Sequence, residues 1–567
     1  MSISKNIIRY FLITFASLHS LAMWSTVPLF NRGETSYIIS IPFNAKPEIQ
    51  FAAKELQHYI LKASGALLPI REQNSSDKYC IFLSADESNS EDFQYYSEGQ
   101  NIRIHGLGGR GIINAIYDFL ENELGIHWLT SETTIIPHIQ SYYISSVERR
   151  GKPAFITRLN YYLDAIQNPL WCQYNRINST NYNSNYPYAH VTWYGMHNFR
   201  YLLSEKDYFV SHPEFFSLKE GKRIKSGQLC LTNPDVLKIV VNSLKKIIRG
   251  RPTYTIYDVS QNDNNNFCQC DKCTEIIKKY GGHSGLNLWF VNQVADSIKK
   301  TFPDKLIGTF AYRYTRQAPK NIKARDNVVI RFCTFESCII HGFSDCKTNT
   351  VFEEDLIQWS KITQHLEVWD YCVGFNQYIA PCPNFRALAE RFCTYKRLNI
   401  SGLLMEGNYE GPWGDFSELR QWIISKLMWN PYQDVDSLAH LFINAYYSDA
   451  APYIWDFYQL TQNQVQSTTH FPIYANFKNP VYTDDYIRKS NQIIERARLI
   501  SQKDSVLSAR VARVAAQVYY LEATRHSSIE TSRINARNRL SDIIKKDSTY
   551  FMEYHKNMTL AFKILGI

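Results

Sequence analysis

The most constraining feature of this sequence is a repeating unit that runs from about residue 153 to residue 431. Each repeat has a short β-rich run, a polar loop and a stretch with the 3.6-residue periodicity of a helix, and nearly eight repeats can be counted. The candidate strands are residues 156–162, 191–195, 228–231, 254–259, 306–312, 328–335, 366–371 and 400–405. Strands that alternate with helices build parallel sheets, so the repeats predict an α/β fold, a (β/α)8 TIM-like barrel at 153–431, with a doubly wound sheet as the alternative.

Two further regions flank the predicted barrel. Residues 34–148 alternate strand and helix signals, with an extended run at 36–41 before an amphipathic stretch at 51–60. They predict a small α/β accessory domain; the full glycine pattern of a dinucleotide site is missing, so no cofactor is predicted. Residues 432–567 have few strand signals and several helical stretches, and predict a helical C-terminal domain.

The first residues carry an export signal. Lys5 and Arg9 precede an apolar stretch at 10–18, and Ser20-Leu21-Ala22 matches a cleavage site. We predict a signal peptide at residues 1–22 and an exported protein, either periplasmic or secreted and displayed at the cell surface. The apolar run is shorter than the roughly 20 residues of a spanning helix and no later segment qualifies, so no membrane span is predicted after signal cleavage.

The charge distribution and the aromatic content limit the kinds of partner that this protein can bind. The net charge of +9 comes from 62 basic and 53 acidic residues without a long run of Lys or Arg, whereas nucleic-acid-binding proteins concentrate basic residues in a patch or stripe. We therefore expect no nucleic-acid partner. The 39 Tyr, 31 Phe and 11 Trp suit stacking on sugars but also fill cores and interfaces. The sequence does not indicate an oligomeric state.

The cysteines form one dense group. All 12 follow the predicted cleavage site, and an exported protein can form disulfides. Cys268, Cys270 and Cys273 place three thiols within six residues. Because this spacing differs from a paired C-x-x-C zinc signature, we favour a disulfide or packing role and predict no metal.

Carboxylates follow several of the predicted strands, where barrel enzymes place their functional groups. They are Asp263, Glu336, Asp370 and Glu406. Glycoside hydrolysis needs two carboxyl groups beside one bond, or one acid and a group that orients the substrate's own acetamide. We predict Asp263 and Glu406 to be catalytic, although Asp263 could instead cap a turn. Glu336 and Asp370 are predicted to bind substrate or to belong to a buried network.

Other polar and aromatic residues near the strand ends complete the predicted substrate site. They are Asn262, His197, Trp369, Tyr371 and Asn408. Trp369 and Tyr371 could stack on a sugar ring, but they alternate with Asp370 along the chain and could instead face the helices. His197 could donate a hydrogen bond to substrate or be a core histidine.

Several stretches of the predicted barrel resemble a known family. They are His212-Pro-Glu-Phe-Phe216, Gln228-Leu-Cys-Leu-Thr-Asn-Pro234, Ser260-Gln-Asn-Asp263 with the cysteine group, Val368-Trp-Asp-Tyr371, and Glu406-Gly-Asn-Tyr409 with Leu427-Met-Trp-Asn-Pro431. They resemble bacterial proteins that carry the domain of unknown function 4838, later placed in glycoside hydrolase family 163, over most of residues 150–450. Residues 34–148 are similar to the accessory domain before the barrel in family 20 hexosaminidases and family 67 α-glucuronidases.

This resemblance implies an exported endo-β-N-acetylglucosaminidase of the kind found in gut Bacteroidetes. Its substrate would be a glycan or glycoprotein, cut in the chitobiose core of complex N-glycans with retention. In the related hexosaminidases an adjacent Asp-Glu pair orients the acetamide and protonates the leaving oxygen, whereas this sequence has Asn262-Asp263 there. Either Asn262 holds the acetamide and Asp263 is the acid, or Asp263 orients it and Glu406 is the acid.

Two other functions remain open from the sequence. One is a different glycosidase specificity, either exo-hexosaminidase or α-glucuronidase, for which Arg313, Arg316 and Arg331 could supply a basic pocket. The other is a non-catalytic glycan-binding barrel.

Overall fold

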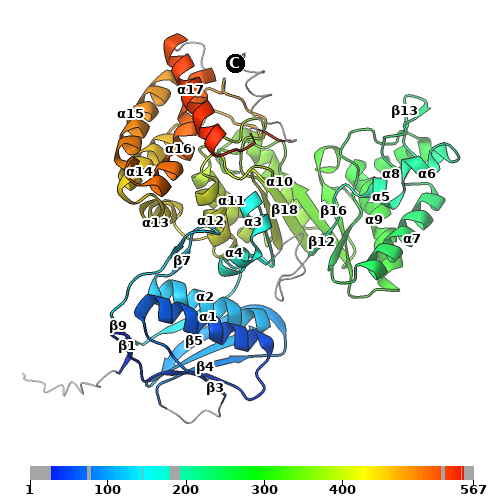
Figure 1. Cartoon of the computed structure of the whole chain (residues 1–567). Helices are drawn as coiled ribbons and strands as arrows, with labels where there is room; N and C mark the ends of the chain where they lie inside the picture. The colour runs from blue at the N-terminus through cyan, green and yellow to red at the C-terminus, as the bar shows by residue number, and fades with distance from the viewer. Residues whose placement is uncertain are drawn as a thin grey trace, which may run out of the picture.

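The computed structural model describes residues 27–72, 78–144, 146–178, 192–524, 530–550 and 552–553. The predicted signal peptide at 1–22 lies outside the described residues. Figure 1 shows three regions: an N-terminal domain in blue, a curled parallel sheet with its helices in cyan to yellow-green, and C-terminal helices in orange to red.

The N-terminal region is an α/β domain, as predicted. In its described part six strands form a sheet in the order β10-β5-β6-β4-β2-β3, and α1 (Pro47–Ser64) and α2 (Gly109–Leu124) lie side by side on one face (Figure 1). The strands are β2 (Ile38–Ile41), β3 (Ile70–Glu72), β4 (Cys80–Ala85), β5 (Asn89–Glu98), β6 (Asn101–Gly108) and β10 (Glu148–Gly151). Helix α1 buries Ala53, Leu56 and Ile60 against the sheet and ends at Gly65, whose φ of 77° is a left-handed conformation that glycine adopts without strain.

The central region is a TIM-like half-barrel, which confirms the predicted fold class. Among the described residues, seven strands pair in parallel in the order β11-β19-β18-β17-β16-β15-β12. They are β11 (Thr157–Tyr161), β12 (Trp193–Tyr194), β15 (Ile256–Asp258), β16 (Leu306–Ala311), β17 (Val328–Cys333), β18 (His365–Tyr371) and β19 (Gly402–Glu406). Strands β11 and β12 are the two edges of this sheet, so in its described part the sheet curls without closing.

One predicted strand is wrong. Residues 228–231 lie outside the sheet, and Leu229 makes only an isolated bridge with Phe216. The apolar run at this position reflects burial rather than sheet pairing, because Leu229, Cys230 and Leu231 pack in the core just before α7 (Pro234–Gly250). The segment instead supports the loop after β15, as described below.

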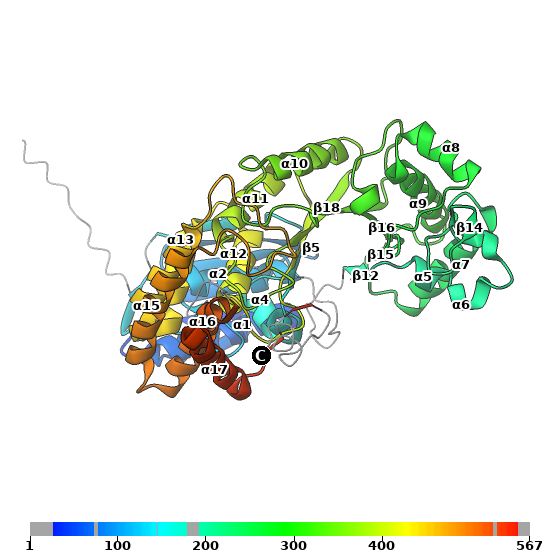
Figure 2. The same cartoon turned by 90° about the horizontal axis from the view of Figure 1, so that it is seen from above.

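Helices lie along the sheet from one edge to the other. Helices α7, α8 (Asp271–Tyr280) and α9 (His283–Lys299) pack near β12, β15 and β16, while α10 (Lys347–Ser360), α11 (Phe385–Arg397) and α12 (Ser417–Trp429) follow the later strands. The C-terminal helices are α13 (Val435–Tyr447), α14 (Ala451–Gln462), α15 (Asp484–Ser501), α16 (Ser505–Thr524) and α17 (Glu530–Lys546). Figures 1 and 2 both show these helices at the end of the molecule opposite α7–α9.

Helix α12 joins the three regions. All residues from Ser417 to Trp429 except the partly buried Glu418 are buried, which is the pattern of a helix enclosed on nearly all sides. Trp429 at its end stacks on Phe93 of the N-terminal sheet with ring centroids 6.0 Å apart. Across the described ranges, no helix combines the length and the apolar character needed to cross a bilayer.

Candidate active site

A pocket of about 220 Å³ opens at the carboxyl ends of β16–β19, where a barrel enzyme is expected to place its chemistry. Its walls combine strand ends, loops and parts of the C-terminal region. The lining residues are Tyr161, Met196, His197, Asp263, Phe310, Tyr312, Arg313, Cys333, Phe335, Trp369, Tyr371, Phe375, Glu406, Tyr409, Ile473, Tyr474 and Glu553. Of the sequence-predicted site residues, the structure brings together His197, Asp263, Trp369, Tyr371 and Glu406.

The rings of Trp369 and Tyr371 form one wall of this pocket. Successive residues of a strand point to opposite faces, so these two side chains share a face of β18 while Asp370 takes the other. The two rings stack at a centroid distance of 6.3 Å with 21° between their planes. The arrangement answers the question that the sequence left open, because both rings face the pocket and not the helices.

Glu406 is the last residue of β19, paired in register with Tyr371 and with Tyr161 on the two neighbouring strands. Its side chain is buried, and Trp369 Nε1 donates a hydrogen bond of 2.7 Å to its Oε2. Burial raises the pKa of Glu406 to about 8, against the lowering effect of the indole hydrogen bond. A neutral carboxyl held through one oxygen can carry its proton on the other, which makes Glu406 a competent proton donor at neutral pH.

Asp263 lies in the loop after β15 and is far more open, with 46% of its side chain exposed. The Tyr312 hydroxyl donates a hydrogen bond of 3.2 Å to its Oδ1, and Arg313 Nη1 lies 3.4 Å from the same oxygen. These two contacts fix one carboxylate oxygen at the pocket. The geometry suits a carboxylate that orients a polar group of the substrate.

Gln228 holds the loop that carries Asp263 through side-chain hydrogen bonds. Gln228 Nε2 donates to the carbonyls of Asn262 and Asn264, at 2.8 Å each, and its Oε1 accepts from Asn262 N at 2.9 Å. The extended segment at 228–231 therefore acts as a support for this loop. Sequence reasoning missed Gln228 because the surrounding run was interpreted as a barrel strand.

Asn262 and Glu336, which were predicted to bind substrate, do not line the pocket. Asn262 Nδ2 donates to Gly227 O at 2.9 Å and its Oδ1 accepts from Arg200 N at 3.0 Å, so its amide is used to hold the loop. Glu336 is partly exposed and lies 3.6 Å from Arg316 Nη1, outside the cavity.

His197 lines the pocket in an uncommon backbone conformation, with φ at 52°. Its Nδ1–H donates to Gln261 O at 2.7 Å, and its backbone N–H donates to Ser260 Oγ at 3.1 Å. Burial lowers the pKa of His197 despite the hydrogen bond to Gln261. A neutral imidazole with Nδ1 occupied leaves Nε2 as an acceptor, so His197 is fitted to receive a hydrogen bond from substrate rather than to donate one.

Asp370 and Asn408 do not line the pocket, and for Asp370 the structure contains the buried network that was the alternative to substrate binding. Asp370 faces the helices and is fully buried, with its oxygens 2.8 Å from Arg391 Nη1, 2.6 Å from the Tyr395 hydroxyl and 2.6 Å from Thr334 Oγ1. Asn408 bridges Gly411 O and Ser417 Oγ and shapes the loop after β19.

We predict that Asp370→Asn destabilises the protein by about 3–5 kcal/mol, because it leaves the buried Arg391 guanidinium without its counter-charge. Chemical denaturation at neutral pH measures the change. The matched control is Asp296→Asn, which breaks a half-exposed pair with Arg325 at 3.0 Å and should cost less than about 1 kcal/mol. Equal effects of the two variants would contradict a structural role for the Asp370–Arg391 pair.

Several pocket residues were missed by sequence reasoning. Phe310 with Tyr312, and Cys333 with Phe335, are alternate residues at the ends of β16 and β17. The two-residue spacing that they share with Trp369 and Tyr371 is a signal that could have found them. Tyr474 and Glu553 come from the C-terminal region, and the Tyr474 hydroxyl donates to Glu553 Oε2 at 3.1 Å. No sequence signal links those two residues to the barrel.

Arg313, Arg316 and Arg331, on which the alternative α-glucuronidase function depended, lie in different surroundings. Arg331 is buried inside the sheet, with Nη2 2.8 Å from Glu367 Oε2 and its guanidinium over the Trp193 ring. Arg316 pairs with Asp355 at 2.9 Å, and Arg313 reaches the pocket, where it faces Asp263. The placement does not gather these cations into a site for a sugar carboxylate.

Comparisons with known proteins bear on this site. The family model of the domain of unknown function DUF4838 matches residues 128–459. No curated protein matches the sequence. Among solved structures, a family GH115 4-O-methyl-α-glucuronidase with specificity for decorated arabinogalactans is 12% identical, with 91% of this chain and 76% of that chain covered and a TM-score of 0.52. At this identity the similarity shows a shared fold alone.

Two further solved structures have lower scores. A GH138 enzyme that targets pectin rhamnogalacturonan II is 11% identical, with 90% of this chain and 93% of that chain covered and a TM-score of 0.43. A β-N-acetylhexosaminidase from Bacteroides fragilis is 12% identical, with 72% and 89% covered and a TM-score of 0.41.

Proposed function

Because the family model covers more than half of its length, this chain belongs to the DUF4838 family, and we propose that it is a retaining endo-β-N-acetylglucosaminidase that cleaves the chitobiose core of complex N-glycans. The observation that carries the proposal is the buried carboxyl of Glu406 in a ring-walled pocket that it shares with the exposed carboxyl group of Asp263. The shared fold with a glycosidase supports the reaction class. The signal peptide predicted at residues 1–22 agrees with action in the periplasm or outside the cell.

Glu406 is the general acid in this mechanism. As the glycosidic bond breaks, its proton passes to the leaving oxygen, which would otherwise depart as a costly alkoxide. The apolar, ring-lined surroundings keep the carboxyl neutral until that moment, and the Trp369 indole stabilises the carboxylate that forms.

Asp263 orients the acetamide of the substrate. Its carboxylate, held by Tyr312 and Arg313, accepts the acetamide N–H and turns the acetamide oxygen toward the anomeric carbon. That oxygen forms a bond to the anomeric carbon as the leaving group departs with the proton of Glu406. Water then opens the cyclic intermediate, returns a proton to Glu406, and gives net retention. Asn262 is not available for this role, because its amide holds Gly227 and Arg200.

A single assay tests the proposed reaction. Purified protein is incubated with a biantennary N-glycoprotein, and both the released glycan and the remaining protein are weighed by mass spectrometry. The proposal expects a glycan that ends in one N-acetylglucosamine and a protein that keeps one. Release of single sugars would show an exo-glycosidase instead, and binding of intact glycan without product would show a non-catalytic barrel.

The acid role predicts a pH dependence of kcat/KM. Glu406 is protonated below its pKa of about 8 and ionises above it, so activity should fall tenfold per pH unit on the alkaline side of that value. A pH–rate profile with the N-glycoprotein as substrate measures this fall in kcat/KM. A profile that stays flat well above pH 8 would contradict Glu406 as the acid.

A further inference from the structure

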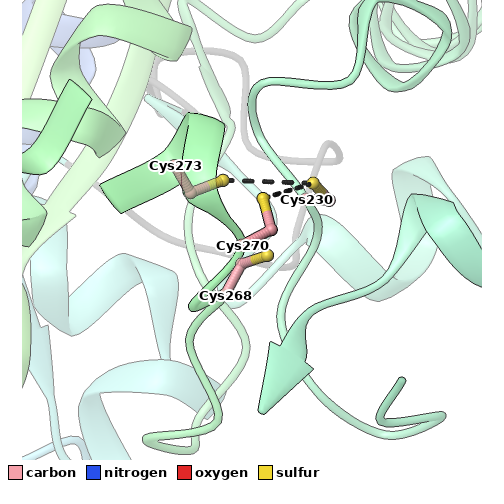
Figure 3. A group of neighbouring side chains, drawn as sticks. All are labelled: Cys230, Cys268, Cys270 and Cys273. Atoms are coloured by element: carbon pink, nitrogen blue, oxygen red, sulfur yellow. Dashed lines mark hydrogen bonds between the residues drawn. The ribbon is translucent and has the colours of Figure 1, made fainter. Parts of the chain in front are cut away.

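Four cysteine thiols from separate segments of the chain converge (Figure 3). They are Cys230, Cys268, Cys270 and Cys273, and their Sγ atoms all lie within 4.8 Å of one another. Cys230 comes from the segment before α7, Cys268 and Cys270 follow the Asp263 loop, and Cys273 lies in the first turn of α8. The sequence alone shows three of these thiols together, and the fold supplies the fourth.

The spacing of the sulfur atoms fits a tetrahedral metal site. A zinc–thiolate bond is about 2.3 Å long, which in a tetrahedron places sulfur atoms about 3.8 Å apart. Cys230 Sγ lies 3.6 Å from Cys270 Sγ and 3.9 Å from Cys273 Sγ. A disulfide would need about 2.05 Å between sulfur atoms, and Cys230, Cys268, Cys270 and Cys273 are free thiols. Of the disulfide or packing role favoured from the sequence, the disulfide is therefore absent from this group.

We propose that these four thiolates bind a structural zinc ion. Four sulfur ligands in a tetrahedral arrangement select zinc or iron, and a site closed by four protein ligands has no open position for catalysis. A hydrogen bond from outside the ligand set also supports one of the sulfurs, because the backbone N–H of Leu218 donates to Cys268 Sγ at 3.3 Å.

The ion would cross-link the two segments that position Asp263. Gln228, which clamps the loop, is two residues before Cys230, and Cys268 follows Asp263 at the other end of the loop. Zinc would thus join the segment that contains Gln228 to the end of the loop at Cys268. The proposal does not depend on the reaction assigned to the pocket, since it concerns the order of this loop and the metal content of the protein.

An independent cluster carries a second site of the same kind. The ligand atoms of Cys338, His341, Cys346 and His470 lie within 4.8 Å of one another. Each cysteine Sγ is 3.3 Å from a histidine Nδ1, of His341 for Cys338 and of His470 for Cys346. His341 Nε2 donates to Gln466 O at 3.1 Å, which turns Nδ1 toward the sulfurs as in metal-bound histidines. We infer a second structural zinc with two thiolate and two imidazole ligands.

This second ion would tie the barrel to the C-terminal region. Cys338, His341 and Cys346 lie between β17 and α10, whereas His470 lies between α14 and α15. Just after His470, the backbone N–H of Phe471 donates to Cys338 Sγ at 3.2 Å, and Ile473 and Tyr474 then line the pocket. The site would hold that pocket wall against the barrel.

Metal analysis of the purified full-length protein tests both sites. After growth with zinc and removal of free metal, elemental mass spectrometry should find about two zinc ions per chain. Cys270→Ser, at the least buried thiol of its cluster, and His470→Asn, at an exposed ligand, should each lose one. The matched control is Cys393→Ser, a thiol outside both clusters that should keep both ions.

Two further readouts keep the proposal testable if a variant folds poorly. The cobalt-substituted wild-type protein should show the visible bands of tetrahedral Co²⁺ with thiolate charge transfer, and intact mass should show no loss of hydrogen from disulfides. Zinc-free protein with oxidised cysteine pairs would overturn both sites. A variant that keeps two ions would overturn the site to which its residue belongs.

Discussion

The Glu406→Gln variant is expected to turn over N-glycoprotein about 10³-fold more slowly than the wild-type protein, within the range for loss of a general acid. Glutamine keeps the size of the side chain and can accept the hydrogen bond from Trp369 Nε1, but it has no acidic proton to give. The loss should therefore appear in kcat, with the fold unchanged. Initial rates of glycan release, followed by mass spectrometry, measure it.

A substrate with a good leaving group separates the acid role from a loss of binding. A dinitrophenyl glycoside departs without protonation, so Glu406→Gln should recover most of its activity on that substrate. The control is Glu275→Gln on the exposed face of α8, which should stay within about twofold of wild type on both substrates. Near wild-type glycan release by Glu406→Gln would remove Glu406 from the mechanism.

The same variant has a stability signature. The pKa of Glu406 is raised from 4.5 to about 8 in the folded protein, so above pH 4.5 the unfolded chain loses a proton that the folded protein keeps. Folding stability is therefore lost progressively as pH rises from 4.5 to about 8, by an amount on the order of 4 kcal/mol. Glutamine does not ionise, so its variant does not lose this stability as pH rises. Denaturation at pH 8 should therefore show Glu406→Gln to be more stable than wild type, with no gain at pH 4.5.

The barrel could be predicted from sequence because its strands recur between helical stretches, and periodicity is a local property. The position of Glu406 at a strand end follows from the same pattern. Which residues of β18 face the pocket could not be predicted in this way. Whether Asp370 or its neighbours Trp369 and Tyr371 face the pocket depends on strand register in the folded sheet, and a shift of one residue exchanges the two faces.

Long-range contacts account for the other differences. The apolar run at 228–231 has the composition of a strand, yet it packs under the Asp263 loop, where Gln228 supplies the hydrogen bonds that a neighbouring strand would otherwise make. Cys230 joins the other three thiols, and Glu553 reaches the pocket, only through tertiary packing. Sequence spacing shows contacts within a loop, whereas these contacts join segments that are far apart in the chain.

The Asp263→Asn variant is expected to lose about 10²–10³-fold in kcat, the range for removal of one preorganised electrostatic contact. An asparagine oxygen can still accept the acetamide N–H, but it lacks the charge that builds up the nucleophilic character of the acetamide oxygen. Because 46% of the side chain is exposed, the fold should be unaffected. The rate of glycan release, with Asp456→Asn on the exposed face of α14 as the control, measures the loss.

The leaving group distinguishes this role from that of Glu406. Attack by the acetamide is needed whatever the leaving group, so Asp263→Asn should stay slow on the dinitrophenyl glycoside, where Glu406→Gln recovers. The opposite pattern, in which Asp263→Asn recovers and Glu406→Gln does not, would exchange the two roles. That exchange would require Asp263 to deliver a proton to the leaving oxygen, although the Tyr312 hydroxyl and the Arg313 guanidinium both direct N–H or O–H groups at its Oδ1. The contacts in the pocket therefore favour Glu406 as the acid and Asp263 as the group that orients the acetamide.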